Sequence, residues 1–470
     1  MLPFNIHHSF SKTAIIADDG TRLTYGGLSD FSESLNKAMP HRSLVFCLCQ
    51  NTVGSLSGYI SFIAGRMVPV MLDSKINPGF LAGLVKKYKP RYIWLPDRLL
   101  NEFPTTERVF SGHRYSLIRL NASDDWHLHP DLAILLTTSG STGSPKFVRI
   151  SYENLEANAG SIAGYLSINE HERPITTLPM SYAYGLSVIN SHLLKGATIL
   201  LTIKTLVERD FWSFLKDHRA SSISGIPYTY EILERIKFRQ MQLPSVKTLT
   251  QAGGKMPDKL FIEFAEFCAG SGKQFFAMYG QTEATARMSY LPARDALLKP
   301  GSIGQAIPGG EFILVDENRT VITGSDRTGE LVYKGRNVSM GYSTGPGDLE
   351  KGDENQGILF TGDLAKRDRD KYYFIVGRKS RFIKIFGNRV SLDETERLLE
   401  NIVPECLCTG VDDHLVIYIT DKTRGDEVKQ YISSLTGVHP AAVSIRYCSE
   451  IPKNETGKPQ HSVPASHDDH

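Results

Sequence analysis

The chain has 470 residues, and its 53 Lys and Arg against 51 Asp and Glu give a formal net charge of +2. Hydrophobic residues make up 41% and charged residues 22%, which is typical of folded globular proteins and excludes a disordered or fibrous chain. The near-neutral charge argues against nucleic-acid binding, and six cysteines are too few for a disulfide framework in a chain this long.

From the N-terminus to about Gly301, β-branched runs alternate with amphipathic helical patterns. SLVFCLC, LAILLTT and KQFFAMY are typical of strands, whereas LSDFSESLNKAM, PGFLAGLVKKY and DKLFIEFAEFC carry apolar residues three and four apart. Strands alternating with helices predict a layered α/β architecture. The most apolar stretch, GYISFIAGRMVPVML, is interrupted by Arg66 and Pro69, and the first residues lack a secretory signal pattern. We therefore expect no membrane span and a cytoplasmic location.

After Gly301 the pattern changes twice. EFILVDE, GELVYKG and YYFIVGR are short strand-like runs separated by turn residues, so a β-rich part should follow the α/β part. From about residue 380, runs such as HLVIYITD and GDEVKQYISSL indicate a small α+β unit of its own.

The segment LAILLTTSGSTGSPKFVRIS holds the strongest functional signal. A predicted strand is followed by hydroxyl and glycine residues and then by Lys146, and these groups can surround a polyphosphate with N–H, O–H and ammonium donors. A Walker A loop requires a second glycine where this chain has Pro145 and Ser or Thr where it has Phe147. The run KFVRI also continues as a strand before Ser151 can cap a helix, so a P-loop NTPase is excluded.

TTSGSTGSPK resembles the phosphate loop of the acyl-adenylate-forming superfamily, which includes acyl-CoA synthetases, adenylation domains and luciferases. Further segments resemble the family's signatures in the same order: YGQTE, GSIGQAIPGG with GELVYKGRNVSMGY, TGD, GRKSRFIKIFGNRVSLDETE and PKNETGK. The likeness covers about residues 10 to 458. With the element pattern, it implies an α/β fold whose residues 1–379 form two layered α/β subdomains and a β-rich subdomain, with a small mobile α+β domain at 380–470.

The resemblance also implies roles for individual residues. Glu283 would ligate Mg²⁺ and Thr282 would bond the α-phosphate of ATP. Lys458 would bridge the substrate carboxylate and that phosphate. Lys384 would face the active site in a second state, which the small domain forms by rotating after the first step. The residues expected to bind the nucleotide are Thr138, Ser139, Gly140, Ser141, Thr142, Gly143, Lys146, Gly253, Gly254, Tyr279, Gly280, Asp363 and Arg378.

The segment LPMSYAYGLS limits the substrate. Where the family often has a pocket histidine this chain has Tyr182, and where amino-acid-activating members carry Asp it has Ala183. Because a buried ammonium without a counter-charge is costly, an α-amino acid is disfavoured. We expect the acid pocket to be lined by Tyr182, Ala183, Tyr184, Ser187, Val188, Ser224 and Gly225. Ser380 at the hinge and Phe147 after the loop lysine are further departures from the family pattern.

The expected function is ATP- and Mg²⁺-dependent activation of a small-molecule carboxylate as acyl-AMP, followed by transfer to a pantetheine thiol. That thiol would belong to CoA or to the phosphopantetheine of a separate acyl carrier protein. Two alternatives stay open at this point: an amine or hydroxyl acceptor, and a non-catalytic nucleotide-binding relative. The presence of Lys146, Glu283, Asp363 and Lys458 argues against the non-catalytic alternative.

Overall fold

The computed structural model describes residues 10–39, 41–103, 107–121, 126–137, 146–379, 381–385, 388–400, 402–411, 413–436 and 439–453. The chain forms two compact units, unit 1 with Met1–Glu311 and Tyr333–Leu359, and unit 2 with Phe312–Val332 and Phe360–His470. The expected domain boundary between residues 379 and 380 stays a prediction. No helix in the described ranges has the length and apolar character that crossing a membrane requires.

Unit 1 contains a nine-stranded sheet in the order β16-β15-β14-β13-β12-β10-β11-β1-β2. Its central neighbours pair in parallel, whereas β2, β15 and β16 pair antiparallel at the two ends. The strands are β1 (Thr13–Ala17), β2 (Arg22–Thr24), β10 (Pro174–Ile175), β11 (Ile199–Leu201), β12 (Ser222–Gly225), β13 (Thr248–Gln251), β14 (Gln274–Tyr279), β15 (Ser289–Leu291) and β16 (Gln305–Ala306).

An eight-stranded sheet in the order β19-β9-β8-β4-β3-β5-β7-β6 is the second layer of unit 1. Its strands are β3 (Leu44–Cys49), β4 (Val68–Asp73), β5 (Tyr92–Pro96), β6 (Glu107–Gly112), β7 (Tyr115–Arg119), β8 (Leu132–Thr137), β9 (Phe147–Ser151) and β19 (Gly341–Ser343). In β3, Val45 and Cys47 belong to one apolar cluster, and Phe46 and Leu48 belong to another. Both faces of this strand are therefore covered, which explains its unbroken apolar run.

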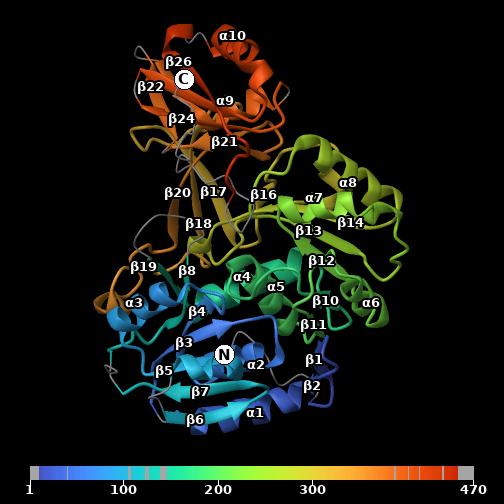
Figure 1. Cartoon of the computed structure of the whole chain (residues 1–470), viewed down its shortest axis with the longest axis vertical. Helices are drawn as coiled ribbons and strands as arrows, with labels where there is room; N and C mark the ends of the chain where they lie inside the picture. Colours follow the sequence, from blue (N-terminus) through green and yellow to red (C-terminus); the bar gives the residue numbers. More distant parts are fainter. Residues whose placement is uncertain are drawn as a thin grey trace. The chain divides into compact units, whose positions relative to one another are not determined.

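The helices of unit 1 pack on these sheets, with α1 beside α2 and α4 beside α5 (Figure 1). They are α1 (Tyr25–Lys37), α2 (Val53–Ala64), α3 (Pro78–Tyr88), α4 (Tyr152–Tyr165), α5 (Ala183–Leu194), α6 (Arg209–Asp217), α7 (Pro227–Arg235) and α8 (Asp258–Gly270). One apolar cluster joins strands of both sheets to α1, α2 and α5, so these helices fill the space between the layers.

The start of α4 shows how the local sequence sets an element boundary. Ser151 is the N-cap, its hydroxyl accepts from the backbone N–H of Asn154 at 3.0 Å, and the Asn154 side chain accepts from the Ser151 N–H at 2.9 Å. This reciprocal capping box satisfies two donors that a helix start would leave unpaired. It confirms that the segment after Lys146 is a strand followed by a helix capped at Ser151.

Unit 2 contains most of a four-stranded sheet in the order β17-β18-β20-β21, with β17 (Gly310–Val315), β18 (Gly329–Gly335), β20 (Ile358–Arg367) and β21 (Tyr373–Arg378). A hairpin follows, β22 (Phe382–Ile385) and β23 (Asn388–Ser391), and then a three-stranded sheet of β24 (Cys406–Val411), β25 (His414–Ile419) and β26 (Val443–Tyr447). Helices α9 (Leu392–Leu399) and α10 (Gly425–Thr436) share an apolar core with these strands. The predicted α/β, β-rich and α+β order is confirmed.

Candidate active site

The loop that follows β14 carries the predicted magnesium ligand. A side chain at Gly280 would place its Cβ 1.7 Å from the carbonyl oxygen of Ala286, so only glycine allows the loop to fold back this closely. Thr285 and Ala286 have φ values of 56° and 96°, a left-handed conformation that is strained for residues with a side chain. Backbone strain of this kind is found most often at functional sites.

Hydrogen bonds from neighbouring elements hold this strained loop. The Asn337 amide donates to the carbonyls of Ala284 at 2.8 Å and Arg287 at 2.9 Å, and the Asn158 amide donates to the same Arg287 carbonyl at 3.0 Å. The Thr285 hydroxyl donates to the Asn337 carbonyl at 2.8 Å. Asn158 lies on α4 and Asn337 follows β18, so residues distant in sequence fix the position of the loop.

Thr282 and Glu283 lie on the short helix η3 (Thr282–Ala284) within this loop. The Tyr342 hydroxyl donates to Glu283 Oε1 at 2.7 Å. The Lys146 ammonium lies 3.8 Å from the centre of the Tyr342 ring, a cation–π contact. Burial and the neighbouring Glu283 carboxylate raise the pKa of Tyr342, so its hydroxyl stays a donor. Tyr342, which the sequence analysis did not single out, thus contacts two of the predicted site residues.

This arrangement suits a magnesium nucleotide. Within the described ranges no three His, Cys, Asp or Glu side chains come together as a metal site. Mg²⁺ typically takes one or two carboxylates and fills its other positions with phosphate oxygens and water. A single carboxylate, Glu283, together with the Lys146 cation is therefore a fitting donor set for Mg²⁺ and polyphosphate. The predicted phosphate-loop residues Thr138, Ser139, Gly140, Ser141, Thr142 and Gly143 lie outside the described residues.

The predicted nucleotide-binding glycines lie after β13. Gly253 has a φ of +86°, and a Cβ there would lie 2.8 Å from the Tyr182 hydroxyl. The Gly254 carbonyl accepts from the Gln251 amide at 2.8 Å. The absence of a side chain at Gly253 therefore allows Tyr182, the residue in place of the family's histidine, to approach the backbone closely. Tyr279 is the last residue of the neighbouring strand β14, and Gly280 comes directly after it.

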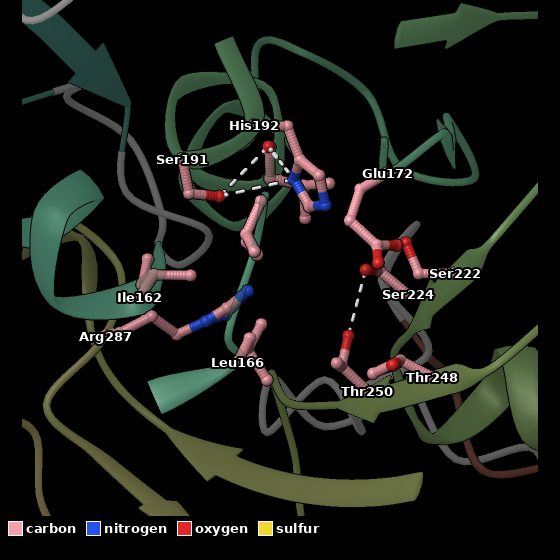
Figure 2. A pocket seen from close by; sticks show the side chains of 12 residues that line it. Ile162, Leu166, Glu172, Ser191, His192, Ser222, Ser224, Thr248, Thr250 and Arg287 are labelled. Carbon is pink, nitrogen blue, oxygen red and sulfur yellow. Dashed lines mark hydrogen bonds between the residues drawn. The ribbon is translucent and has the colours of Figure 1, made fainter. Parts of the chain in front are cut away.

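The residues predicted to line the acid pocket separate into two groups. Val188 and Ser224 lie in the wall of a cavity of about 20 Å³ (Figure 2). The Tyr184 hydroxyl donates at 3.0 Å to the carbonyl of Thr250, which is a wall residue of this cavity. Ala183 instead belongs to the apolar cluster between the two sheets, and Ser187 donates to the Tyr184 carbonyl at 2.7 Å. Gly225 ends β12, and a Cβ there would lie 2.7 Å from the Thr229 side chain.

Polar side chains dominate the cavity wall, and one of them is a buried arginine that the sequence analysis missed. Arg287 is 1% exposed, and its guanidinium Cζ lies 3.8 Å from the centre of the Tyr184 ring. A charged residue within the run ATARMSY, directly after the YGQTE segment, is the one sequence signal that could have identified it. The other residues of the wall are Ile162, Leu166, Ile168, Glu172, Val188, Ser191, His192, Ser222, Ser224, Thr248 and Thr250.

Asp363 and Arg378 lie in unit 2 and face each other across β20 and β21. Arg378 Nε lies 3.3 Å from Asp363 Oδ1, and the Asp363 side chain is 6% exposed. Lys384 lies on β22, but its side chain, Ser380 and Lys458 are outside the described residues. Their expected roles therefore stay predictions.

Comparison with known proteins identifies the family. The model of the AMP-binding enzyme family matches residues 6–343. The chain is 29% identical over 338 residues to the 2-succinylbenzoate–CoA ligase of Bacillus pumilus, covering 70% of this chain and 67% of that protein. It is 26% identical over 343 residues to the luciferin 4-monooxygenase of Luciola mingrelica, covering 70% of this chain but only 62% of that protein.

A solved structure shows the same fold over almost the whole chain. The o-succinylbenzoate CoA synthetase of Bacillus subtilis, in complex with ATP and magnesium ion, superposes with a TM-score of 0.77 at 21% identity, covering 96% of each chain. The CoA ligase among the relatives agrees with the acid–thiol ligase chemistry that the sequence analysis expected. Because the family model matches more than half of its residues, the chain belongs to the AMP-binding enzyme family.

Proposed function

We propose that this chain is an AMP-forming ligase that activates a carboxylic acid without an α-amine. In the first step an oxygen of the carboxylate attacks the α-phosphorus of ATP, a new P–O bond forms, and pyrophosphate leaves with the electrons of the broken bond. In the second step a pantetheine thiol, giving up its proton, attacks the acyl carbon and releases AMP. The thiol belongs to CoA or to a separate carrier protein, and we place the reaction in the cytoplasm.

One observation carries this proposal: Glu283 and Lys146 contact the same tyrosine, Tyr342, beside the strained loop after β14. An anionic acid approaches an anionic phosphate in the first step, so positive charge placed in advance lowers the barrier most. Glu283 would hold Mg²⁺ and Lys146 would neutralise the leaving phosphates. That an o-succinylbenzoate CoA synthetase of the same fold binds ATP and magnesium supports these roles.

The remaining predicted residues complete the proposal. Thr282 would contact the α-phosphate, Asp363 the ribose hydroxyls, and Lys458 both the incoming carboxylate and the α-phosphate. The name of the Bacillus pumilus relative, a CoA ligase, supports CoA as the acceptor.

Exchange of labelled pyrophosphate into ATP across a panel of carboxylic acids tests the first step. We expect exchange with non-amino acids, and a loss of about 100-fold or more in Glu283→Gln and in Lys458→Ala. AMP release with CoA, a phosphopantetheinyl carrier or an amine then identifies the acceptor. Exchange driven only by α-amino acids, or a fully active Lys458→Ala variant, would contradict the proposal.

A further inference from the structure

Residues 335–342, with the sequence GRNVSMGY, form a connecting segment that extends from the end of β18 into β19. This connecting segment is hydrogen-bonded to the loop after β14. The Ser339 N–H donates to the carbonyl oxygen of Glu283 at 2.8 Å, and the Thr285 hydroxyl donates to the Asn337 carbonyl at 2.8 Å. The backbone of the proposed metal ligand is therefore fixed by a segment about 50 residues further along the chain.

Asn337 is the residue of the connecting segment whose side chain spans the loop. It is 3% exposed, and its amide nitrogen donates to the carbonyls of Ala284 at 2.8 Å and Arg287 at 2.9 Å. Because both carbonyls can only accept, the nitrogen of the amide must face them, and its two N–H donors are both used. The amide oxygen accepts from the Tyr333 hydroxyl at 2.8 Å on the other side.

The two carbonyls that Asn337 binds lie on either side of the strained pair Thr285 and Ala286, whose φ values are 56° and 96°. A left-handed conformation costs free energy in residues with a side chain, so it persists only where the surroundings hold it. The Asn337 amide supplies two of the bonds that do so. Without them the loop could relax, and Glu283 would move with it.

Helix α4 holds Asn337 from the side away from the loop. The Asn154 amide donates to the carbonyls of Arg336 at 2.7 Å and Val338 at 2.8 Å, which are the two neighbours of Asn337. Asn154 is 7% exposed and lies in the first turn of α4. The backbone at Asn337 is therefore fixed independently of the loop that its side chain supports.

The far end of the connecting segment holds the carboxylate of the same glutamate. Tyr342 pairs with Val148 on β9, the strand that begins directly after Lys146. Its hydroxyl donates to Glu283 Oε1 at 2.7 Å, and its ring contacts the Lys146 ammonium. One segment thus fixes both the backbone and the side chain of Glu283 beside the phosphate-binding lysine.

We propose that Asn337 is a positioning residue for the first step of the reaction, acting through Glu283. Its two amide donors keep the strained loop in the conformation that presents the Glu283 carboxylate to the magnesium of the bound nucleotide. This inference rests on the proposed ligase function and deepens it, because it assigns a role in metal binding to a residue that does not itself contact the metal. What the reaction needs from Asn337 is its pair of donors rather than its size.

A magnesium titration of pyrophosphate exchange tests the inference. In Asn337→Ala we expect exchange at limiting Mg²⁺ to fall about 100-fold, the effect of moving a positioned group by about 1 Å. The half-saturating Mg²⁺ concentration should rise about tenfold, whereas the KM for the acid should stay within about threefold, because the lost bonds act on the metal ligand. Asn337→Asp keeps the size of the side chain but turns an acceptor toward the two carbonyls, so it should lose at least as much.

A double-mutant cycle separates positioning from a general structural role. If Asn337 acts through Glu283, adding Asn337→Ala to Glu283→Gln should reduce exchange by less than about threefold further, because residues that act as a unit are not additive. A structural role would lower exchange by the same factor in both backgrounds.

Two further variants control for folding. Tyr333→Phe removes only the hydroxyl that orients the Asn337 amide, so it should raise the half-saturating Mg²⁺ concentration by about threefold, in keeping with the loss of one neutral hydrogen bond. Asn36→Ala is the matched control, because the Asn36 amide also donates to a backbone carbonyl, that of Ser61, but between α1 and α2. It should leave the magnesium dependence unchanged. Urea denaturation shows that each variant is folded under the assay conditions.

Three results would overturn the inference. An unchanged half-saturating Mg²⁺ concentration in folded Asn337→Ala and Asn337→Asp would refute it while the ligase function stands. Equal losses in the two backgrounds of the cycle would show that Asn337 does not act through Glu283. A parent protein without exchange on any carboxylic acid would refute the ligase function itself, and this inference with it.

Discussion

Arg149 and Arg287 are both buried in unit 1, at 0% and 1% exposure, but their surroundings differ. Arg149 donates to the carbonyls of Met340, Tyr342, Lys351 and Gly352 and pairs with Glu354. Arg287 lies over an aromatic ring, and two of its nitrogens have no hydrogen-bond partner among the described residues.

The difference separates an arginine whose donors the fold satisfies from one that keeps two nitrogens without a partner among the described residues. Arg149, on β9, fastens the segment that contains β19 and Tyr342, and the folded chain supplies all the acceptors that it needs. Burial of a charge is tolerated in such a place because the hydrogen bonds offset the lost hydration. At Arg287 the described residues supply no hydrogen-bond acceptor for Nε or Nη1.

The largest expected effect is the loss of stability caused by replacing Arg149. Arg149→Met should lower the free energy of unfolding by about 3–5 kcal/mol, because it leaves buried carbonyls without donors. Urea denaturation measures the loss. Glu354→Gln is the control: Glu354 is 51% exposed, so its charge should contribute less than about 1 kcal/mol. Equal losses in the two variants would mean that the ion pair, rather than the carbonyl contacts, holds the segment.

His192 is another buried titratable residue of unit 1, and its ring is neutral in the folded chain at physiological pH. Its pKa is lowered to about 4 in the folded chain, against about 6.5 when unfolded. Below pH 6.5 the unfolded chain binds a proton that the folded chain does not, so stability should fall as the pH falls from 6.5 to 4, by about 3 kcal/mol. Denaturation midpoints across this range, compared with those of His192→Gln, measure it. If the denaturation midpoints of the parent and of His192→Gln changed in parallel with pH, the lowered pKa of His192 would be contradicted.

The loop that carries Arg287 depends on Gly280. In Gly280→Ala the new Cβ would meet the Ala286 carbonyl, so the loop must shift and take Glu283 with it. We expect pyrophosphate exchange to fall by about 100-fold, because a displacement of about 1 Å has that effect on positioned groups. Gly160→Ala in α4, where no atom lies within 4 Å of the new Cβ, should keep full activity. Wild-type exchange in Gly280→Ala would show that the loop geometry is not needed.

Tyr342 connects the segment fastened by Arg149 to the proposed metal ligand. Tyr342→Phe keeps the ring beneath Lys146 but removes the hydrogen bond to Glu283. A hydrogen bond to a charged group contributes about 1.5 kcal/mol at the lower end of its range, which suits the partly exposed Tyr342, so exchange at limiting Mg²⁺ should fall about tenfold. A magnesium titration measures this, and saturating Mg²⁺ should restore part of the activity. A loss independent of magnesium would place the role of Tyr342 elsewhere.

The smallest effect is expected at Arg287 itself. Arg287→Met should change the free energy of unfolding by less than about 1 kcal/mol, because the lost stacking on Tyr184 is offset by removing an unpaired buried charge. Urea denaturation without ligand, run beside Arg149→Met, gives the direct contrast. A destabilisation as large as that of Arg149→Met would mean that Arg287 also serves the fold.

Much of the architecture followed from local patterns. The alternation of strands and helices, the β-rich segment after Gly301 and the α+β segment at the end each occur where the sequence predicts them, because hydrophobic periodicity and caps act over a few residues. Ser151 is an example, since its cap contacts lie within three residues. The contacts of Tyr342 and Arg149 join residues about 60 and 190 or more apart, and no local pattern encodes them.

The sequence by itself determined the family, through short motifs whose order and spacing are specific. It also predicted Glu283 as a magnesium ligand and Lys146 as a nucleotide-binding cation. Only the tertiary structure decided which of two equally buried arginines has its donors used by the chain, and that the other, Arg287, lines a small cavity with two nitrogens that no described residue pairs. The physical reason is that hydrogen-bond satisfaction depends on which carbonyls and carboxylates the fold brings within about 3 Å, and that neighbourhood is assembled from segments far apart in the chain.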